Sequence, residues 1–419
     1  MSSCTLRAPK AVKQILLINI FGRDQIGVTR TVTRTLSLFD ITVLDIGQAV
    51  IHDQLTLGIL AAVSKNYSTF SVVESISSEI SKLGMRVKCF PIPSKNYQDW
   101  VDQQGKQRHI VSLLAPKIEA RYLEVVTEKI SEFGLNIDKI TRLSGRTAYK
   151  SIDCSTQVCV EFSIRGETRY ADSFRSSLLE LGACHDIDIA YQKDSIYRRS
   201  RRLIVFDMDS TLIDSEVIDD LAVEAGVGDE VSAITASAMG GEMDFEKSLR
   251  MRVALLRGLK QDVLLHVANR LRLTQGSEYL LKRLRQLGFK TAIVSGGFLF
   301  FASRLQSILK VDYVFANELE IVDEHLTGYL KGEIIDGNRK AELLRELAVQ
   351  EGLHLEQVIA VGDGANDLPM LQAAGMGVAF KAKPLVRVSA KYAISHSGLD
   401  GILYLMGYSD RDLQALGSE

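Results

Sequence analysis

The sequence predicts an α/β protein in which two small α+β domains precede a doubly wound parallel-sheet domain with a helical cap. Two observations support this prediction. In the first half of the chain, a strand–helix–strand–strand–helix–strand pattern of apolar residues occurs twice. From Leu203 onward, apolar strands alternate with helical patterns, which is typical of a parallel sheet with helices on both faces.

The two copies of the first pattern share a constant spacing. Three pairs of apolar residues lie 94 residues apart: Leu16 and Ile110, Phe39 and Phe133, Ile46 and Ile140. Each copy therefore reads as βαββαβ, which packs two helices on one face of an antiparallel sheet. We expect the first domain at 12–95 and the second at 107–193, joined by a polar linker at 93–106.

The third domain is expected at 200–410, with its helical cap at about 214–273. It follows a basic run, Tyr197-Arg-Arg-Ser-Arg-Arg202, which we interpret as a solvated boundary. A parallel sheet of this kind places its functional site at the carboxyl ends of the strands.

Composition limits the classes of function. The 419 residues include 50 Lys and Arg against 52 Asp and Glu, so nucleic acid is not expected as a partner. The five cysteines form no CxxC pair, which favours a reducing compartment. No apolar run is long enough for a signal peptide or a membrane span. We therefore expect a cytoplasmic protein with no membrane partner.

Two acids follow the first strand of the third domain. Leu203–Phe206 is a buried strand pattern, and Asp207 and Asp209 come directly after it. Carboxylates two residues apart at a strand end lie on the same side and repel each other unless a cation or a proton is shared. A turn or helix-cap role would explain Asp209 alone, but not both acids.

Three later segments supply complementary groups. Ser295-Gly-Gly follows another apolar strand and offers a hydroxyl and free backbone N–H groups. Lys340 lies near the start of a predicted helix, and Asp363 and Asp367 follow a further buried strand. Each group by itself has an ordinary structural interpretation. Together they predict a Mg²⁺-dependent phosphoryl-transfer site.

The order of these motifs resembles a known family. DMDST, then SGG, then a lysine, then GDGAND is similar to the phosphoserine phosphatases of the haloacid dehalogenase superfamily. The βαββαβ units resemble ACT domains, which stand in tandem before the catalytic domain in the longer bacterial form of this family. The resemblance covers nearly the whole chain.

The resemblance implies a role for each acid. Asp207 is the nucleophile that forms an aspartyl-phosphate, and Asp209 is the acid that protonates the serine oxygen and the base that then activates water. Mg²⁺ is held by a carboxylate oxygen of Asp207, the backbone carbonyl of Asp209, and Asp363. Asp367 orients the metal waters or the lysine from outside this ligand set.

The resemblance also implies the substrate contacts. The groups that hold the phosphoryl oxygens or the substrate are Ser295, Gly296, Lys340 and Asn366. In the cap, Glu216 pairs with the ammonium of phosphoserine and Arg252 with its carboxylate, while Met239 and Phe245 form an apolar lid. Without the resemblance, the two charged residues could equally belong to a solvated helix.

The substrate expected from these contacts is free O-phospho-L-serine. Three alternatives remain: another small phosphate ester, phosphoserine in proteins, or an amino-acid sensor whose catalytic half is vestigial. The pairing of Glu216 and Arg252 favours a free amino acid, because a residue within a peptide carries neither charge.

The loop after the first strand is where ACT domains bind small ligands. The first copy has Asp24 to Gly27 there, and we expect L-serine to bind it, although Asp24 could equally cap the helix. The second copy has Pro116 to Glu119 and no glycine, which disfavours ligand binding. We also expect a homodimer formed through the ACT-like domains.

Overall fold

The computed structural model describes residues 12–103, 105, 107–146, 157–167, 170–239 and 243–417, with side chains for all of these except 12, 13 and 239. The chain divides into two compact units, Met1–Lys106 and Gln107–Glu419. Among the described helices, none is both long enough and apolar enough to span a bilayer.

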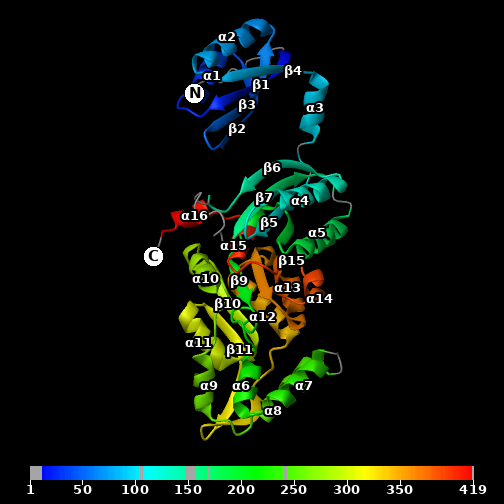
Figure 1. Ribbon diagram of the computed structural model, residues 1–419, viewed down its shortest axis with the longest axis vertical. Coiled ribbons are helices and arrows are strands. Elements are labelled where there is room, and N and C mark those ends of the chain that lie inside the picture. The colour runs from blue at the N-terminus through cyan, green and yellow to red at the C-terminus, as the bar shows by residue number, and fades with distance from the viewer. Residues whose placement is uncertain are drawn as a thin grey trace, which may run out of the picture. The chain divides into compact units, whose positions relative to one another are not determined.

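The first unit is a four-stranded antiparallel sheet covered on one face by two helices (Figure 1). The strand order is β2-β3-β1-β4. The apolar stripes of both helices pack on alternate residues of the central strands β1 and β3, which explains the burial of Ile18 and Ile59. The elements are β1 (Val12–Arg23), α1 (Val28–Ser37), β2 (Thr42–Ile51), β3 (Gln54–Ser64), α2 (Thr69–Lys82) and β4 (Arg86–Ile92).

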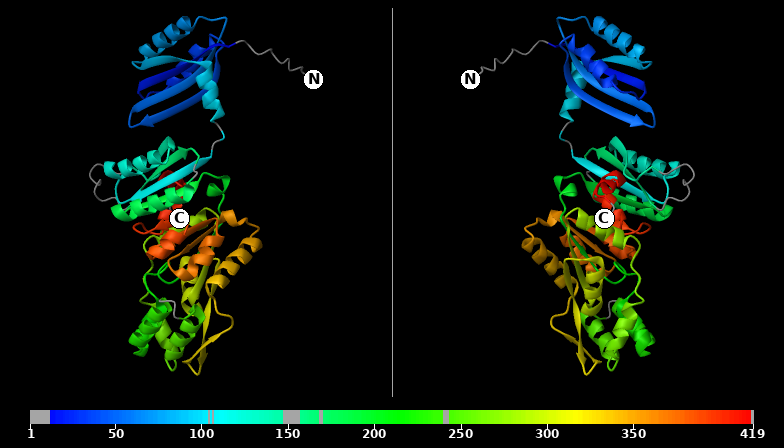
Figure 2. Two further views of the ribbon diagram at one scale, coloured as in Figure 1. Left: turned by 90° about the vertical axis from the view of Figure 1, so that its right-hand side faces the viewer. Right: turned by 90° about the vertical axis from the view of Figure 1, so that its left-hand side faces the viewer.

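The second unit begins with a sheet of the same arrangement, in the order β6-β7-β5-β8, again with two helices on one face (Figure 2). The βαββαβ pattern predicted for both copies is therefore confirmed. The elements are β5 (Arg108–Ala115), α4 (Ala120–Glu132), β6 (Asn136–Arg142), β7 (Val158–Arg165), α5 (Ala171–His185) and β8 (Asp188–Lys193).

The predicted spacing of 94 residues is wrong for the first strand. Leu16 faces the helices of its unit, whereas Ile110 lies on the opposite face of its sheet, and Val111 takes the helix-facing position instead. The spacing of 94 does hold for the helices, where Val28 matches Tyr122. The strand-to-helix loop of the second copy is thus one residue shorter, and a shift of one residue turns every strand side chain to the other face.

The stretch predicted as a polar linker contains a helix, α3 (Ser94–Asp102). Its only large apolar surface comes from Tyr97, Trp100 and Val101, whose spacing places them on one helical face. The rings of Tyr97 and Trp100 are 6.1 Å apart. Polar composition concealed this short amphipathic pattern.

The remainder of the second unit is built on a seven-stranded sheet in the order β12-β11-β10-β9-β13-β14-β15. All neighbouring strands are parallel except β12, an antiparallel edge strand that sequence reasoning did not anticipate. The strands are β9 (Leu203–Phe206), β10 (Lys290–Phe298), β11 (Tyr313–Val322), β12 (His325–Lys331), β13 (Val358–Gly362), β14 (Met376–Phe380) and β15 (Tyr392–Ile394).

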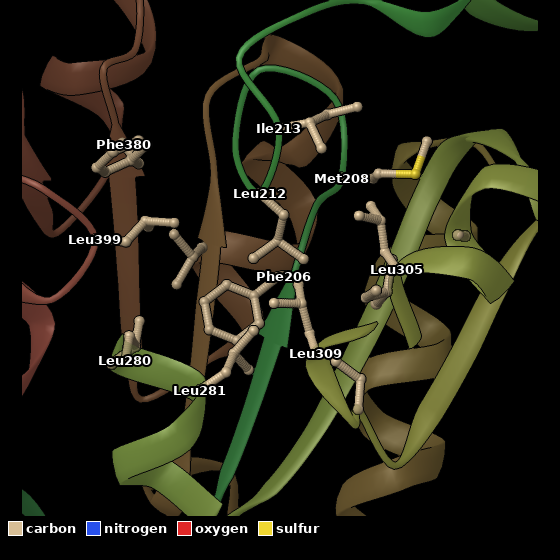
Figure 3. Packing of buried hydrophobic residues seen from close by; sticks show 14 of the residues in the cluster. Phe206, Met208, Leu212, Ile213, Leu280, Leu281, Leu305, Leu309, Phe380 and Leu399 are labelled. Atoms are coloured by element: carbon tan, nitrogen blue, oxygen red, sulfur yellow. The ribbon is translucent and has the colours of Figure 1, made fainter. Parts of the chain in front are cut away.

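Helices cover both faces of this sheet, as the predicted doubly wound class requires. On one face, Phe206 packs with Leu280 and Leu309, and Figure 3 shows this cluster. On the other face, Val205 packs with Leu344. The helices are α10 (Ser277–Gln286), α11 (Leu299–Leu309), α12 (Gly337–Gln350), α13 (Leu368–Ala373), α14 (Pro384–Ser389), α15 (Gly401–Leu405) and α16 (Asp410–Ala415).

Four helices lie between β9 and α10, in the stretch where a cap is expected. They are α6 (Val217–Ala225), α7 (Gly228–Met239), α8 (Phe245–Leu255) and α9 (Gln261–Ala268). Figures 1 and 2 show them at the end of the seven-stranded domain opposite the second four-stranded sheet. We call these four helices the cap.

The basic run before β9 is not a solvated boundary. Arg198 and Arg201 are only 3% and 5% exposed. Arg198 forms an ion pair with Glu161 of β7, and its Nε donates to the carbonyl of Leu405 at 3.4 Å. Both arginines are buried because the second four-stranded sheet packs directly on the seven-stranded domain, which charge composition alone cannot indicate.

Candidate active site

The carboxyl ends of β9 and β13 bring the predicted acids together. Asp207 follows Phe206 and is 5% exposed, and its backbone N–H donates to the carbonyl of Val361 at 2.8 Å. Oxygens of Asp207, Asp363 and Asp367 lie within 4.8 Å of one another. Asp209 lines the same pocket, and its Oδ1 accepts a hydrogen bond from the Val217 N–H at 3.0 Å.

Lys340 lies beneath these acids and is fully buried. Its Nζ is 2.8 Å from Asp207 Oδ1 and 2.6 Å from Asp367 Oδ1. Burial alone would lower the pKa of Lys340, but the two carboxylates outweigh that effect and raise it. The lysine therefore stays charged and holds both acids in place.

The charge balance of the cluster fits a divalent cation. Burial and repulsion from Asp367 raise the pKa of Asp207 to about 7, although Lys340 opposes the shift. Burial and the charges of Asp207 and Asp367 raise the pKa of Asp363 to about 8. These raised pKa values indicate that the two carboxylates have too little positive charge nearby to stay ionised. A hard divalent cation would supply that charge, and such ions prefer oxygen ligands.

Both carboxylate oxygens of Asp367 already have partners within the protein. Oδ1 contacts Lys340, and Oδ2 accepts the Gly364 N–H at 3.0 Å. Within the described part of the chain, Asp363 accepts one side-chain hydrogen bond, from the Thr211 hydroxyl at 3.2 Å. Asp207 and Asp363 are therefore the better placed carboxylates for a cation, with Asp367 outside them.

The end of β10 forms a tight cradle. Ser295 is fully buried, and its Oγ accepts the Gly297 N–H at 2.9 Å. A Cβ at Gly296 would lie 2.7 Å from the ring of Phe245, and one at Gly297 would overlap a carboxylate oxygen of Asp209. A larger residue at either position would displace these side chains, and glycine lets the backbone N–H groups approach an anionic oxygen closely.

The cap supplies the opposite wall of one pocket with a volume of about 830 Å³. Glu216 stands at the start of α6 and accepts the Ser210 hydroxyl at 2.7 Å. Phe245 and Arg252 line the pocket from α8. The structure thus gathers eleven of the predicted residues at one pocket or directly beneath it: Asp207, Asp209, Glu216, Phe245, Arg252, Ser295, Gly296, Lys340, Asp363, Asn366 and Asp367.

Met239 is the exception among the predicted cap residues. It is the last residue of α7, and its side chain lies outside the described residues. Its predicted place in the lid stays a prediction.

Sequence reasoning assigned no role to three polar residues that support the site. Ser210 and Thr211 lie within the DMDST motif and bind Glu216 and Asp363. Asn317 of β11 is 2% exposed, donates to the Gly296 carbonyl at 2.8 Å and accepts the Ile335 N–H at 2.9 Å. A polar residue inside the apolar strand pattern of β11 was the available signal for Asn317.

In the first unit, the loop before α1 has glycine where the predicted ligand loop requires it. Gly27 has a φ of 97° and directly precedes the helix. Among the described residues no side chain caps α1, so the alternative of Asp24 as a helix cap is wrong. Asp24 instead donates its backbone N–H to the Asp53 carbonyl at 2.7 Å.

Comparisons with known protein families agree with this geometry. The family model for haloacid dehalogenase-like hydrolases matches residues 204–372, and the ACT domain model matches residues 14–89. A solved HAD family hydrolase from Salmonella enterica serovar Typhi is 32% identical with a TM-score of 0.62, and the alignment covers 71% of this chain and 98% of that one. The fold and the matched segment define a haloacid dehalogenase-like hydrolase with an ACT domain.

Two relatives align over nearly their whole length. A phosphoserine phosphatase from Streptomyces coelicolor is 39% identical over 401 residues, which is 96% of this chain and 94% of the relative. The phosphoserine phosphatase SerB2 from Mycobacterium tuberculosis is 37% identical over 404 residues, 96% of this chain and 95% of the relative. The chain belongs to the phosphoserine phosphatase family.

Proposed function

We propose that this protein hydrolyses O-phospho-L-serine to L-serine and phosphate, the last step of serine biosynthesis, with Mg²⁺ as its cofactor. The observation that carries the proposal is the Asp207 carboxylate, which lies between the buried ammonium of Lys340 and a pocket walled by Glu216 and Arg252. That arrangement combines a nucleophile with two groups of opposite charge for a free amino acid.

The reaction proceeds in two displacements. A carboxylate oxygen of Asp207 attacks phosphorus, the bond to the serine oxygen breaks, and Asp209 gives that oxygen its proton. Water then loses a proton to Asp209 and attacks phosphorus, which releases phosphate and restores the Asp207 carboxylate. Burial, together with the charges of Glu216 and Asp207, raises the pKa of Asp209 well above its usual value, which suits its role as a proton donor near neutral pH.

Asp207, the backbone carbonyl of Asp209, and Asp363 would hold the Mg²⁺ ion. When bound, it screens the repulsion between the dianionic phosphate and the attacking carboxylate. Lys340, Ser295 and the Gly296 N–H hold the phosphoryl oxygens as negative charge shifts among them. Asn366 lines the pocket and contacts the substrate, while Asp367 keeps the Lys340 ammonium in position.

Phosphate release from a small panel of esters tests the proposal. The panel contains phosphoserine, p-nitrophenyl phosphate and a peptide with an internal phosphoserine, each with Mg²⁺ and with a chelator. Asp207→Asn should lower phosphoserine turnover by about 10⁴-fold or more. Asp262→Asn, an exposed acid in α9, is the matched control. Turnover that survives Asp207→Asn would refute the mechanism.

The same panel separates the alternative functions. Arg252→Ala should raise KM for phosphoserine without changing hydrolysis of p-nitrophenyl phosphate, because only phosphoserine carries a carboxylate for the guanidinium. Arg250→Ala is the control, since Arg250 lies on the same helix but pairs with Glu246 on its exposed side. A preference for the peptide would favour a protein phosphatase, and no phosphate release from any ester would favour a sensor.

We further propose that L-serine binds the first unit at Asp24–Gly27 and that the chain forms a homodimer through its ACT-like domains. The positive φ of Gly27 and the exposed edge strand β2 support these two proposals. Titration calorimetry with serine and light scattering on the full chain test them. The cysteine content supports a cytoplasmic location, and the domain boundaries 12–95, 107–193 and 200–410 stay predictions.

A further inference from the structure

The face of the second four-stranded sheet that has no helices is buried against the catalytic domain. Leu114, Cys159 and Ala190 of this face belong to the same hydrophobic cluster as Phe206, the residue that precedes the nucleophile. Strand β8 packs beside β15, the last strand of the catalytic sheet. The second ACT-like domain is therefore continuous with the catalytic core.

A single acid in β8 fixes a loop of the catalytic domain. Asp188 is 4% exposed, and its carboxylate accepts three backbone N–H groups. Oδ1 accepts from Ser395 at 2.6 Å, and Oδ2 accepts from His396 at 3.1 Å and from Ser397 at 2.8 Å. Three buried hydrogen bonds with defined directions therefore hold this loop against β8.

The loop in turn reaches the two chain segments that join the cap to the core. Leu399 donates its N–H to the carbonyl of Gln275 at 2.9 Å. The backbone at Gly398 packs tightly against Gln275, since a Cβ at Gly398 would lie 2.9 Å from the Gln275 carbonyl oxygen. Figure 3 shows Leu399 in the cluster with Leu212 and Phe206.

These two segments, 212–214 and 272–275, form what we call the cap connection. Ile213 and Leu273 make a β-bridge, Asp214 donates to the Arg272 carbonyl at 3.1 Å, and Thr274 donates to the Leu212 carbonyl at 2.9 Å. Leu212 also donates to the Met208 carbonyl at 2.8 Å. The cap connection thus runs from the catalytic DMDST loop directly into Glu216 and α6.

We propose that the second ACT-like domain sets the position of the cap over the catalytic acids. Asp188 is the positioning residue through which this domain acts on the cap. Hydrogen bonds or adjacency in the chain join each step of a series that runs from Asp188 through loop 395–399, Gln275 and Leu212 to Met208. Asp188 is not among the residues that line the pocket. Its effect reaches the site through Glu216, which lies two residues after the cap connection.

Amide hydrogen exchange on the full chain tests the physical link. In Asp188→Asn, peptides that cover 210–216 and 270–277 should exchange about tenfold faster than in the parent protein, because local opening is favoured when the loop loses its anchor. Gln192→Leu is the matched control. Gln192 lies on the same strand, is 2% exposed, and donates to the Leu405 carbonyl at 2.8 Å, away from the cap connection.

Unchanged exchange at the cap connection in Asp188→Asn, or equal acceleration in Gln192→Leu, would overturn the inference. Should Asp188→Asn not fold, Gly398→Ala disturbs the same series beyond the domain interface. It should accelerate exchange at 270–277 and leave β5 to β8 protected. Normal protection at 270–277 in that variant would equally contradict the proposal.

A kinetic measurement provides a second readout and rests on the proposed function. For Asp188→Asn, kcat/KM for phosphoserine should fall about tenfold, since small displacements of binding groups are costly. For p-nitrophenyl phosphate, which has no ammonium or carboxylate for the cap to bind, the change should stay within about twofold. Equal losses on both substrates would indicate mere destabilisation. A parent protein inactive on phosphoserine would refute the proposed function, and hydrogen exchange would then decide the inference alone.

Discussion

Replacing Lys340 by methionine tests the charge balance on which the site depends. Lys340→Met keeps an unbranched apolar chain but removes the ammonium that lies 2.8 Å from Asp207 and 2.6 Å from Asp367. Both acids would then be buried without their cation. We expect losses of stability and of turnover that have the same origin.

The magnitude follows from burial. Lys340 has no exposed surface, so solvent does not screen the interaction, and removing one partner of a buried ion pair costs about 3–5 kcal/mol of unfolding free energy. The loss of one preorganised donor at the phosphoryl site costs a factor of about 10²–10³ in kcat. Without the ammonium, the pKa of Asp207, already raised to about 7 in the parent, would rise further. Protonation of Asp207 would then stabilise the folded variant more than it stabilises the folded parent. The variant should therefore be less destabilised at pH 6 than at pH 8.

Urea unfolding at both pH values and saturating phosphoserine kinetics measure these effects. Lys331→Met is the control, because Lys331 and its partner Glu318 are about half exposed and 3.2 Å apart. An exposed pair contributes less than about 1 kcal/mol. A Lys340→Met variant that keeps its parent's stability at pH 8, or more than about a fifth of its kcat, would refute the charge-balance argument.

Three further predictions concern the metal, a buried histidine and a supporting amide. Chelation should lower the melting temperature and Mg²⁺ should restore it, because cation binding to the folded state offsets repulsion between Asp207 and Asp363; equal melting temperatures would contradict the metal site. Burial, with a smaller effect of Lys193, lowers the pKa of His109 in the folded protein. As pH falls below 6.5, His109 is therefore protonated in the unfolded chain before it is protonated in the folded protein, and the free energy of unfolding drops. His109→Phe should reduce that drop in urea unfolding between pH 7.5 and 5.5, and an unchanged pH dependence would count against it. Asn317→Ala should cost about 1–3 kcal/mol and lower kcat, because the Gly296 carbonyl and the Ile335 N–H lose their partner; retention of both stability and kcat would show that the β10 cradle needs no such support.

Much of the active site could be predicted because its chemistry is local. Asp207 and Asp363 each directly follow a buried strand, Ser295 lies near the end of β10, and parallel strands bring their carboxyl ends to one edge. Lys340 was harder to place by residue type alone, since most lysines are solvated. Its two carboxylate partners come from the segments that follow β9 and β13, and they become visible only in the folded chain.

The domain interface could not be predicted in the same way. The basic run at 197–202 has the composition of a solvated segment, yet Arg198 and Arg201 are buried between two domains. Asp188 had no distinguishing pattern either, because its partners are backbone N–H groups more than 200 residues away. Backbone donors carry no sequence signature, so such contacts are invisible before folding.

The sequence by itself determined the periodicity of most elements, the duplication of the first half, and the order of the catalytic groups along the chain. These features depend on neighbours within a few residues, where spacing and side-chain type are sufficient. Only the tertiary structure decided the one-residue shift between the two copies, the antiparallel edge strand β12, the burial of Arg198 and Arg201, and the hydrogen bonds from the loop 395–397 to Asp188. The physical reason is that burial and register depend on which distant surface covers a face, and a periodic pattern does not specify its partner.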